Sequence, residues 1–196
     1  MPKIISIANQ KGGVGKTTTS INLATSLSAI NKKILLVDAD PQGNASTGMG
    51  ISYDDRDPSL YDLIVSEGFN KNAIKKTIVP GLDIITANTN LAASEIELVN
   101  VDEREFVISN ILSETKDYDY ILIDCPPALG LLTINSLVAS HSVIVPLQSE
   151  FFALEGISSL VNSIKLIKEN FNSDLVIEGI LLTMVDKRNS LSALVE

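Results

Sequence analysis

Residues 10–18, QKGGVGKTT, place two lysines, two threonines and three glycines in nine positions. The segment follows the phosphate-loop pattern G-x-x-x-x-G-K-[ST], except that Gln10 stands at the first glycine position. Glycines let the backbone turn tightly and point successive N–H groups at phosphate oxygens. Lys16 can then reach the β- and γ-phosphates of a nucleotide, and the Thr17 hydroxyl can bind Mg²⁺.

The departure from the pattern brings an additional lysine, Lys11, into the loop. A second cation close to a transferring phosphate stabilises developing negative charge, as an arginine finger does. The alternative is that Lys11 is an ordinary solvated lysine on a loop. The residue types alone leave both interpretations open.

Three aspartates follow apolar runs and are candidates for metal and water chemistry. Asp124 ends YILID, and Asp38 and Asp40 lie in LLVDADPQGN. A carboxylate at the tip of a buried strand beside a phosphate loop can hold the water shell of a magnesium ion, which we expect of Asp124. Asp38 or Asp40 can position an attacking water or hold the metal's water shell. Turn chemistry explains the second pair equally well, since Asp, Pro, Gly and Asn all favour turns.

Short β-branched apolar runs alternate with longer segments of helical period, which predicts a doubly wound, mostly parallel α/β sheet with helices on both faces. The run 38–57, rich in Gly, Asp, Asn and Pro, is predicted to be a long functional loop. The predicted strands are 3–8, 33–37, 82–86, 120–123, 142–146 and 175–183, and the predicted helices are 16–29, 58–66, 102–115, 131–139 and 154–170.

The 196 residues predict a single domain, 1–196. Residues 189–196 begin a helical pattern with no cap or closing strand, so we expect the domain to continue past Glu196 and its C-terminal part to be missing here. A net charge of −9 lacks the overall signature of a nucleic-acid-binding protein. No signal peptide or membrane-spanning run is visible, so we expect a cytoplasmic protein without stable membrane association. The single cysteine, Cys125, excludes an internal disulfide and is expected to be a packed core residue.

Four segments in this order, KGGVGKTT, LLVDADPQGN, ILIDCPP and VIVPLQSEFFALEGISSL, resemble the ParA/Soj chromosome- and plasmid-partitioning ATPases. These are P-loop proteins of the deviant Walker A group, in which the first glycine of the pattern is absent. The resemblance covers residues 3 to about 189. It implies an ATP hydrolase that uses ATP and Mg²⁺ and closes into a sandwich homodimer. The dimer would bind DNA nonspecifically at the nucleoid, act with a ParB-like centromere-binding partner and be reset by hydrolysis.

The resemblance also assigns roles to residues of this chain. Lys11 matches the signature lysine that reaches the ATP of the partner subunit, and Asp40 matches the aspartate that supports attack by water. Asp124 matches the Walker B aspartate, which acts on Mg²⁺ through its water shell, and Asp38 has a less defined place near the metal. The nucleotide-binding residues that it implies are Lys11, Gly12, Gly13, Val14, Gly15, Lys16, Thr17 and Thr18.

Other functions fit parts of the sequence. A MinD-like membrane-associated positioning ATPase shares the fold and would use a basic amphipathic helix in a C-terminal region that these 196 residues do not reach. The phrases DADPQGN and DCPPALG favour the ParA resemblance over this alternative. A cluster carrier related to the nitrogenase iron protein would need two cysteines per subunit, and this chain has one. A non-catalytic ATP sensor is disfavoured because Lys16, Asp40 and Asp124 are all present. The resemblance implies that the chain continues for several dozen residues past Glu196, and that this continuation carries adenine contacts and basic DNA-binding residues.

Overall fold

The strands form one sheet whose spatial order differs from their order along the chain. The computed structural model describes residues 1–66, 68–148 and 153–185. Within these residues it shows a seven-stranded sheet of order β3-β4-β2-β5-β1-β6-β7. All neighbouring strands run parallel except β3 and β4. The strands are β1 (Lys3–Ile7), β2 (Ile34–Asp38), β3 (Ile74–Lys76), β4 (Leu82–Ile85), β5 (Tyr120–Asp124), β6 (Ser142–Gln148) and β7 (Val176–Thr183).

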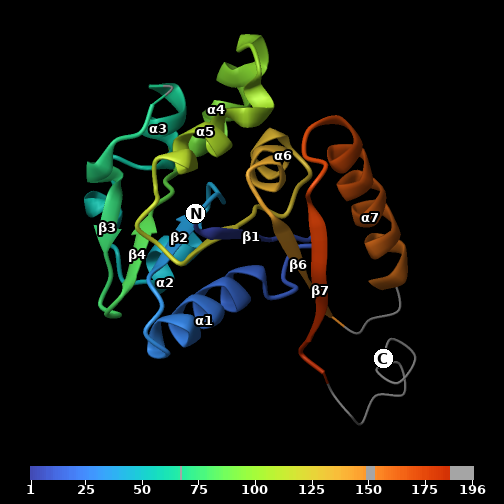
Figure 1. The fold of residues 1–196 in the computed structure, drawn as a ribbon, viewed down its shortest axis with the longest axis horizontal. Coiled ribbons are helices and arrows are strands. Elements are labelled where there is room, and N and C mark those ends of the chain that lie inside the picture. The colour runs from blue at the N-terminus through green and yellow to red at the C-terminus, as the bar shows by residue number, and fades with distance from the viewer. Residues whose placement is uncertain (67, 149–152, 186–196) are drawn as a thin grey trace.

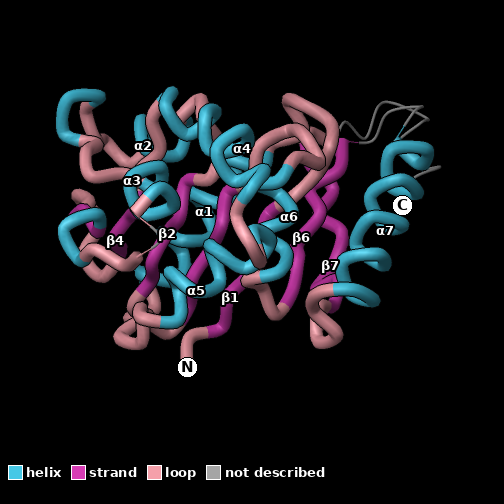
Figure 2. The backbone as a smooth tube through the Cα atoms, turned by 90° about the horizontal axis from the view of Figure 1, so that it is seen from above, coloured by secondary structure: helices cyan, strands magenta, loops and turns pink. Residues whose placement is uncertain are grey.

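Helices cover the two faces of this sheet unequally. Figure 1 shows α1 on one face, whereas α3, α4, α5 and α6 lie on the other, and α7 flanks α6. Figure 2 shows from above how the strands run between these layers. The helices are α1 (Lys16–Ala29), α2 (Asn44–Gly48), α3 (Leu60–Val65), α4 (Ser94–Glu97), α5 (Val107–Ser113), α6 (Leu131–Val138) and α7 (Ala153–Asn170).

Strand β2 shows why the apolar runs of the sequence are continuous. Leu35 and Val37 are fully buried in the cluster that includes residues of α3, α5, α6 and α7. Ile34 and Leu36 are fully buried in the cluster beneath α1. Successive side chains of a strand point to opposite faces, so a strand covered on both faces needs apolar residues at every position.

The register of the central strands brings the candidate carboxylates to one edge. Asp124 at the end of β5 pairs with Ile7 of β1 on one side and with Asp38 of β2 on the other. The loop that follows β1 therefore leaves the sheet level with both aspartates. Parallel strands place their carboxyl ends on the same edge, which is where doubly wound proteins bind ligands.

The predicted fold class is confirmed, and the differences are local. Strand β3 was not predicted because its three residues, Ile-Lys-Lys, carry no apolar run, and it pairs antiparallel at the sheet edge. The predicted loop 38–57 contains the short helix α2. The predicted helix 102–115 begins only at Val107, after a 3₁₀ turn over Arg104–Phe106. Glu103 before that turn has φ 54°, a left-handed conformation that a continuous right-handed helix excludes.

Strand β7 is an edge of the described sheet and is apolar on its surface. Val176, Ile177, Ile180 and Leu181 are each at least 40% exposed. The expected helix at 189–196 lies outside the described residues. Among the described helices, none combines the length and apolar character needed to cross a bilayer.

Candidate functional site

The glycine-rich loop is held in place by the two strands at the β6–β7 edge. Asn9 donates its side-chain amide to the Pro146 carbonyl of β6 at 2.7 Å and accepts the Lys11 backbone N–H at 3.0 Å. Thr183 at the end of β7 donates its hydroxyl to the Val14 carbonyl at 2.8 Å. These bonds fix the loop at both ends, so its central N–H groups are presented in a set arrangement.

Two glycines are required by the backbone of this loop. Gly13 and Gly15 have φ values of 75° and 89°, which residues with a Cβ adopt only at a cost. Gly15 is also the N-cap of α1, whose first turn carries no acidic residue. No carboxylate in the first turn of α1 therefore balances the partial positive charge at the N-terminus of the helix, which faces the loop. This arrangement favours a bound anion.

Lys16 is the buried cation of the site. Its Nζ donates to the Lys11 carbonyl oxygen at 3.1 Å, across the loop. Burial lowers the pKa of Lys16 below its usual value, while the charge of Asp124 opposes that effect. Removal from water makes its positive charge costly, so a phosphate anion in the loop would stabilise both partners.

Asp124 lies next to the first turn of α1 and has an unused oxygen. Its Oδ1 accepts the Ser20 hydroxyl at 3.0 Å. Among the described residues, none donates a hydrogen bond of normal geometry to its buried Oδ2. Burial raises the pKa of Asp124 to about 6, although the Thr17 and Ser20 hydroxyls hold it down. A buried oxygen without a donor is rare in native proteins and fits a hydrated cation that would complete the site.

Asp38 is occupied with holding the next loop. Its Oδ2 accepts both the backbone N–H and the hydroxyl of Ser46 at 2.7 Å, and its Oδ1 accepts the Asp40 N–H at 3.3 Å. Burial raises its pKa to about 7. Both oxygens thus position the segment that carries Asp40, which gives Asp38 a structural task beside any contact with a metal.

Asp40 and the glycine loop line the same pocket. This pocket has a volume of about 350 Å³, and its lining includes Lys16, Thr17, Thr18, Asp40 and Gln42. The Oδ1 of Asp40 accepts the Gln42 N–H at 3.0 Å. Glycines 12, 13 and 15 line the pocket as well, whereas Val14 is buried beneath the loop.

Lys11 lies at the exposed surface of the loop and is not among the residues that line this pocket. Its side chain is thus separated from the interior where Lys16 lies. This placement is compatible with contact across an interface.

The donor set suits Mg²⁺ held largely by a nucleotide. In the described part of the chain, no three side chains of His, Cys, Asp or Glu come together as a metal cluster. Mg²⁺ commonly binds through one or two protein groups, substrate phosphates and several waters. Thr17 would be the protein ligand of the metal, and Asp124 Oδ2 would accept a hydrogen bond from the metal's water shell. This donor set meets the requirement.

Arg56 was missed by the sequence analysis, and it packs behind the Asp40 loop. It is buried and donates to the Ala87 carbonyl at 3.1 Å and to the Thr47 hydroxyl at 2.7 Å. A Cβ on Gly43 would collide with its guanidinium group. No motif marks this arginine, because its partner Ala87 lies 31 residues further along the chain.

Ser20 and Ser46, which bind Asp124 and Asp38, were also missed. Ser20 lies three residues after Thr17 on α1, so the helical period was a usable signal. Cys125 is buried, and burial raises the pKa of its thiol to about 12, as fits a packed core residue.

Fold and site together define a phosphate-loop nucleotide-binding protein of the doubly wound α/β class. A family model described as "AAA domain" matches residues 2–177. The sporulation initiation inhibitor protein Soj of Bacillus subtilis is 54% identical over 192 residues, which are 97% of this chain and 76% of that protein. The chromosome partitioning protein ParA of Caulobacter vibrioides is 49% identical over 193 residues, 97% of this chain and 72% of that protein. The chain therefore belongs to the ParA/Soj family of partitioning ATPases within the AAA-domain proteins.

A solved structure of a protein with a different name shares this fold. Cobyrinic acid a,c-diamide synthase from Mycobacterium smegmatis, with bound ADP and magnesium, superposes with a TM-score of 0.94 at 36% identity. The match covers 100% of this chain and 80% of that one. The relatives named Soj and ParA are more similar in sequence, which favours the partitioning family over the synthase.

Proposed function

We propose that this protein binds ATP with Mg²⁺ and hydrolyses it to switch a DNA-partitioning dimer on and off. One observation carries the proposal: the strand register sets the glycine loop, Lys16 and the unsatisfied Oδ2 of Asp124 around the same edge of the sheet. Backbone N–H groups and Lys16 would bind the phosphates. Magnesium, when bound through Thr17, neutralises charge on the β- and γ-phosphates.

For hydrolysis, we assign Asp40 to the attacking water. Its carboxylate would orient the water and accept its proton as the water oxygen bonds to the γ-phosphorus. The bond between that phosphorus and the β–γ bridging oxygen breaks, which yields ADP and phosphate. Lys16 would stabilise the charge that develops on the phosphoryl oxygens. Asp38 and Ser46 keep the Asp40 segment in place, because both oxygens of Asp38 bind it.

Dimer formation, DNA binding and partner control are the further parts of the proposal, and family membership supports them. Lys11 would contact the nucleotide of the second subunit, so hydrolysis would depend on the dimer. The ATP-bound dimer would associate with nucleoid DNA through lysines and arginines on phosphates, with a ParB-like protein as partner. With a net charge of −9, this contact must use a local basic surface.

The first experiment follows the protein's mass by light scattering with ADP and with a nonhydrolysable ATP analogue. We expect a dimer only with the analogue, and salt-sensitive association of that dimer with any duplex DNA. Lys11→Ala should remove the dimer but leave nucleotide binding intact, whereas Lys16→Ala should lose nucleotide binding itself.

Two other results would replace the proposal. A nucleotide-dependent dimer that ignores DNA but binds anionic liposomes would establish the MinD-like alternative. A protein that binds the analogue yet releases no phosphate from ATP, alone or with DNA, would be a sensor and not a hydrolase.

A further inference from the structure

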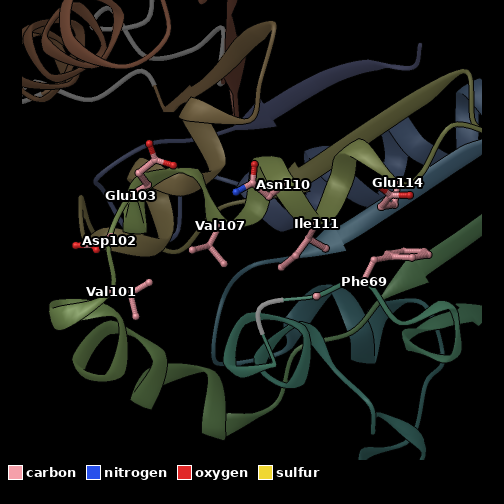
Figure 3. Close-up of a pocket in the computed structure, with 9 residues that line it drawn as sticks. Phe69, Val101, Asp102, Glu103, Val107, Asn110, Ile111 and Glu114 are labelled. Atoms are coloured by element: carbon pink, nitrogen blue, oxygen red, sulfur yellow. The ribbon is translucent and has the colours of Figure 1, made fainter.

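A second hollow lies along α5 and shares no lining residue with the nucleotide pocket. It measures about 330 Å³. Val107 and Ile111 point into it from α5, with Phe69 near one end and Val101 near the other (Figure 3). Four apolar side chains therefore line the hollow beside the exposed amide of Asn110, as in sites that receive an aliphatic or aromatic side chain next to a few polar groups.

The rim of this hollow carries negative charge. Asp102 and Glu103 lie at the Val101 end and Glu114 lies at the Phe69 end (Figure 3), and all three are exposed. No lysine or arginine is among the described residues that line it. Residues 94–114 hold six acidic residues and one arginine, which is −5 of the chain's net charge of −9. Three of these six acidic residues line the hollow itself.

A smaller apolar hollow continues the first toward α3. It has a volume of about 170 Å³ and is lined by Ile64, Val65, Glu97, Leu98 and Val101. Val101 lines both hollows. The α3–α5 groove, meaning these two hollows together, offers two adjacent apolar sockets with carboxylates at the edge.

The chemistry of the groove excludes most classes of occupant. Nucleotides, DNA and anionic headgroups are repelled by Asp102, Glu103 and Glu114. The described residues contain no cluster of three metal-ligating side chains, so a bare cation lacks a site. A cationic segment with apolar side chains complements both the acidic rim and the apolar lining.

We propose that the α3–α5 groove is a docking site for a partner protein segment in which apolar side chains are flanked by lysines or arginines. Two apolar side chains of the segment fill the sockets on either side of Val101. Its basic residues lie against Asp102, Glu103 and Glu114. The groove binds by side-chain burial, and the rim charges select the partner and speed its arrival.

The test uses the fluorescein-labelled peptide KRLKSFKRLK and fluorescence anisotropy with the nucleotide-free protein. Two control peptides separate the two contributions. KRSKSSKRSK keeps the charges without the apolar groups, and EELESFEELE keeps the same three apolar groups with glutamate at each cationic position. We expect the first peptide to bind at least about fivefold more tightly than either control, as anchor side chains in pockets do.

Protein variants locate the site. Asp102→Lys/Glu103→Lys should weaken binding about tenfold, which is 1.4 kcal/mol. The matched control Asp54→Lys/Asp174→Lys makes the same change of charge at exposed positions outside the groove. It should change binding by less than about twofold, because long-range effects between exposed charges are screened.

Val101→Asp distinguishes a groove from diffuse electrostatic attraction. It makes the surface more acidic, so a peptide held only by charge would bind more tightly. A peptide held in the sockets would bind at least about fivefold more weakly. Thermal unfolding checks that each variant is folded. Equal weakening by both double variants, or tighter binding by Val101→Asp, would overturn the proposal.

Discussion

The nucleotide pocket and the α3–α5 groove contain hollows of nearly equal volume, about 350 and 330 Å³, yet they suit opposite ligands. The first is built from loop N–H groups, a helix N-terminus and Lys16, and the carboxylates of Asp124 and Asp38 beside it are buried and accept hydrogen bonds from hydroxyls. The second has exposed carboxylates around apolar side chains. Volume therefore indicates little about function, whereas the placement and solvation of charge indicate the class of ligand.

The largest effect is expected from Asp40→Asn, which keeps the side-chain volume and removes the negative charge. Without a base to orient the water, phosphate release should fall by about 10²- to 10⁴-fold while the affinity for an ATP analogue changes little. Asp54→Asn, at an exposed position, serves as control. Unchanged turnover in the Asp40 variant would remove this aspartate from the chemistry.

The buried carboxyls of the nucleotide pocket should make stability depend on pH. The folded-state pKa values of Asp38 and Asp124 are raised to about 7 and about 6, above the ordinary value of 3.8. The folded protein thus binds more protons than the unfolded chain between about pH 4 and 7. The stabilisation that protonated Asp38 and Asp124 contribute to the unfolding free energy is therefore present at low pH and is lost as pH rises from about 4 to 7.

Asp38→Asn isolates this contribution. The stability of the variant relative to the native protein should rise by roughly 3 kcal/mol from pH 4 to pH 8. Urea unfolding of the native protein and the variant at several pH values measures the difference. A flat difference for Asp38→Asn would mean that this carboxyl ionises as readily in the folded protein as in the unfolded one.

Arg56→Ala tests whether packing behind the Asp40 loop matters for catalysis. Loss of its bonds to Ala87 and Thr47 should cost about 1–3 kcal/mol of stability. Because Arg56 acts through the loop, kcat should fall while KM for ATP stays nearly constant. Arg56→Lys keeps the charge without the forked geometry and should be intermediate. Destabilisation with native kcat would assign Arg56 to stability alone.

The glycines of the loop offer a matched set for backbone strain. Gly13→Ala and Gly15→Ala place a Cβ at positive φ and should each cost about 1–2 kcal/mol of stability. Gly12 has no left-handed φ and open space around its Cβ position, so Gly12→Ala should be nearly neutral. Denaturant unfolding of the three variants gives the comparison, and three equal values would contradict it.

The smallest expected effect is on ATP hydrolysis when the groove is altered, and it tests whether the groove and the nucleotide pocket act independently. Val101→Asp, which should weaken peptide binding in the groove, is expected to leave ATP hydrolysis within about twofold of the native rate, because separate sites behave additively. A large loss of hydrolysis in a folded variant would show that groove and nucleotide pocket are coupled.

The sequence predicted the central sheet and the phosphate loop because both are local patterns. Apolar runs such as 34–37 mark strands buried on both faces, and the loop is a contiguous motif between a strand and a helix. The roles of Arg56 and Ser46 were not predictable, because both side chains also bind the backbone of Ala87, which lies 31 and 41 residues further along the chain. The α3–α5 groove was missed for the same reason: Phe69 and Ile111 meet only after folding.

The two hydrogen bonds that tie the phosphate loop to Pro146 and Thr183 give the β6–β7 edge a mechanical role. A sliding of either strand by a fraction of an ångström would pull on the loop backbone at Asn9 or Val14. Movement of β6 or β7 would therefore be transmitted through these two hydrogen bonds to the loop that would bind the phosphates. A protein segment bound to the exposed edge strand β7 would therefore be coupled to the nucleotide: its binding would affect the phosphate loop, and the bound nucleotide would affect its binding.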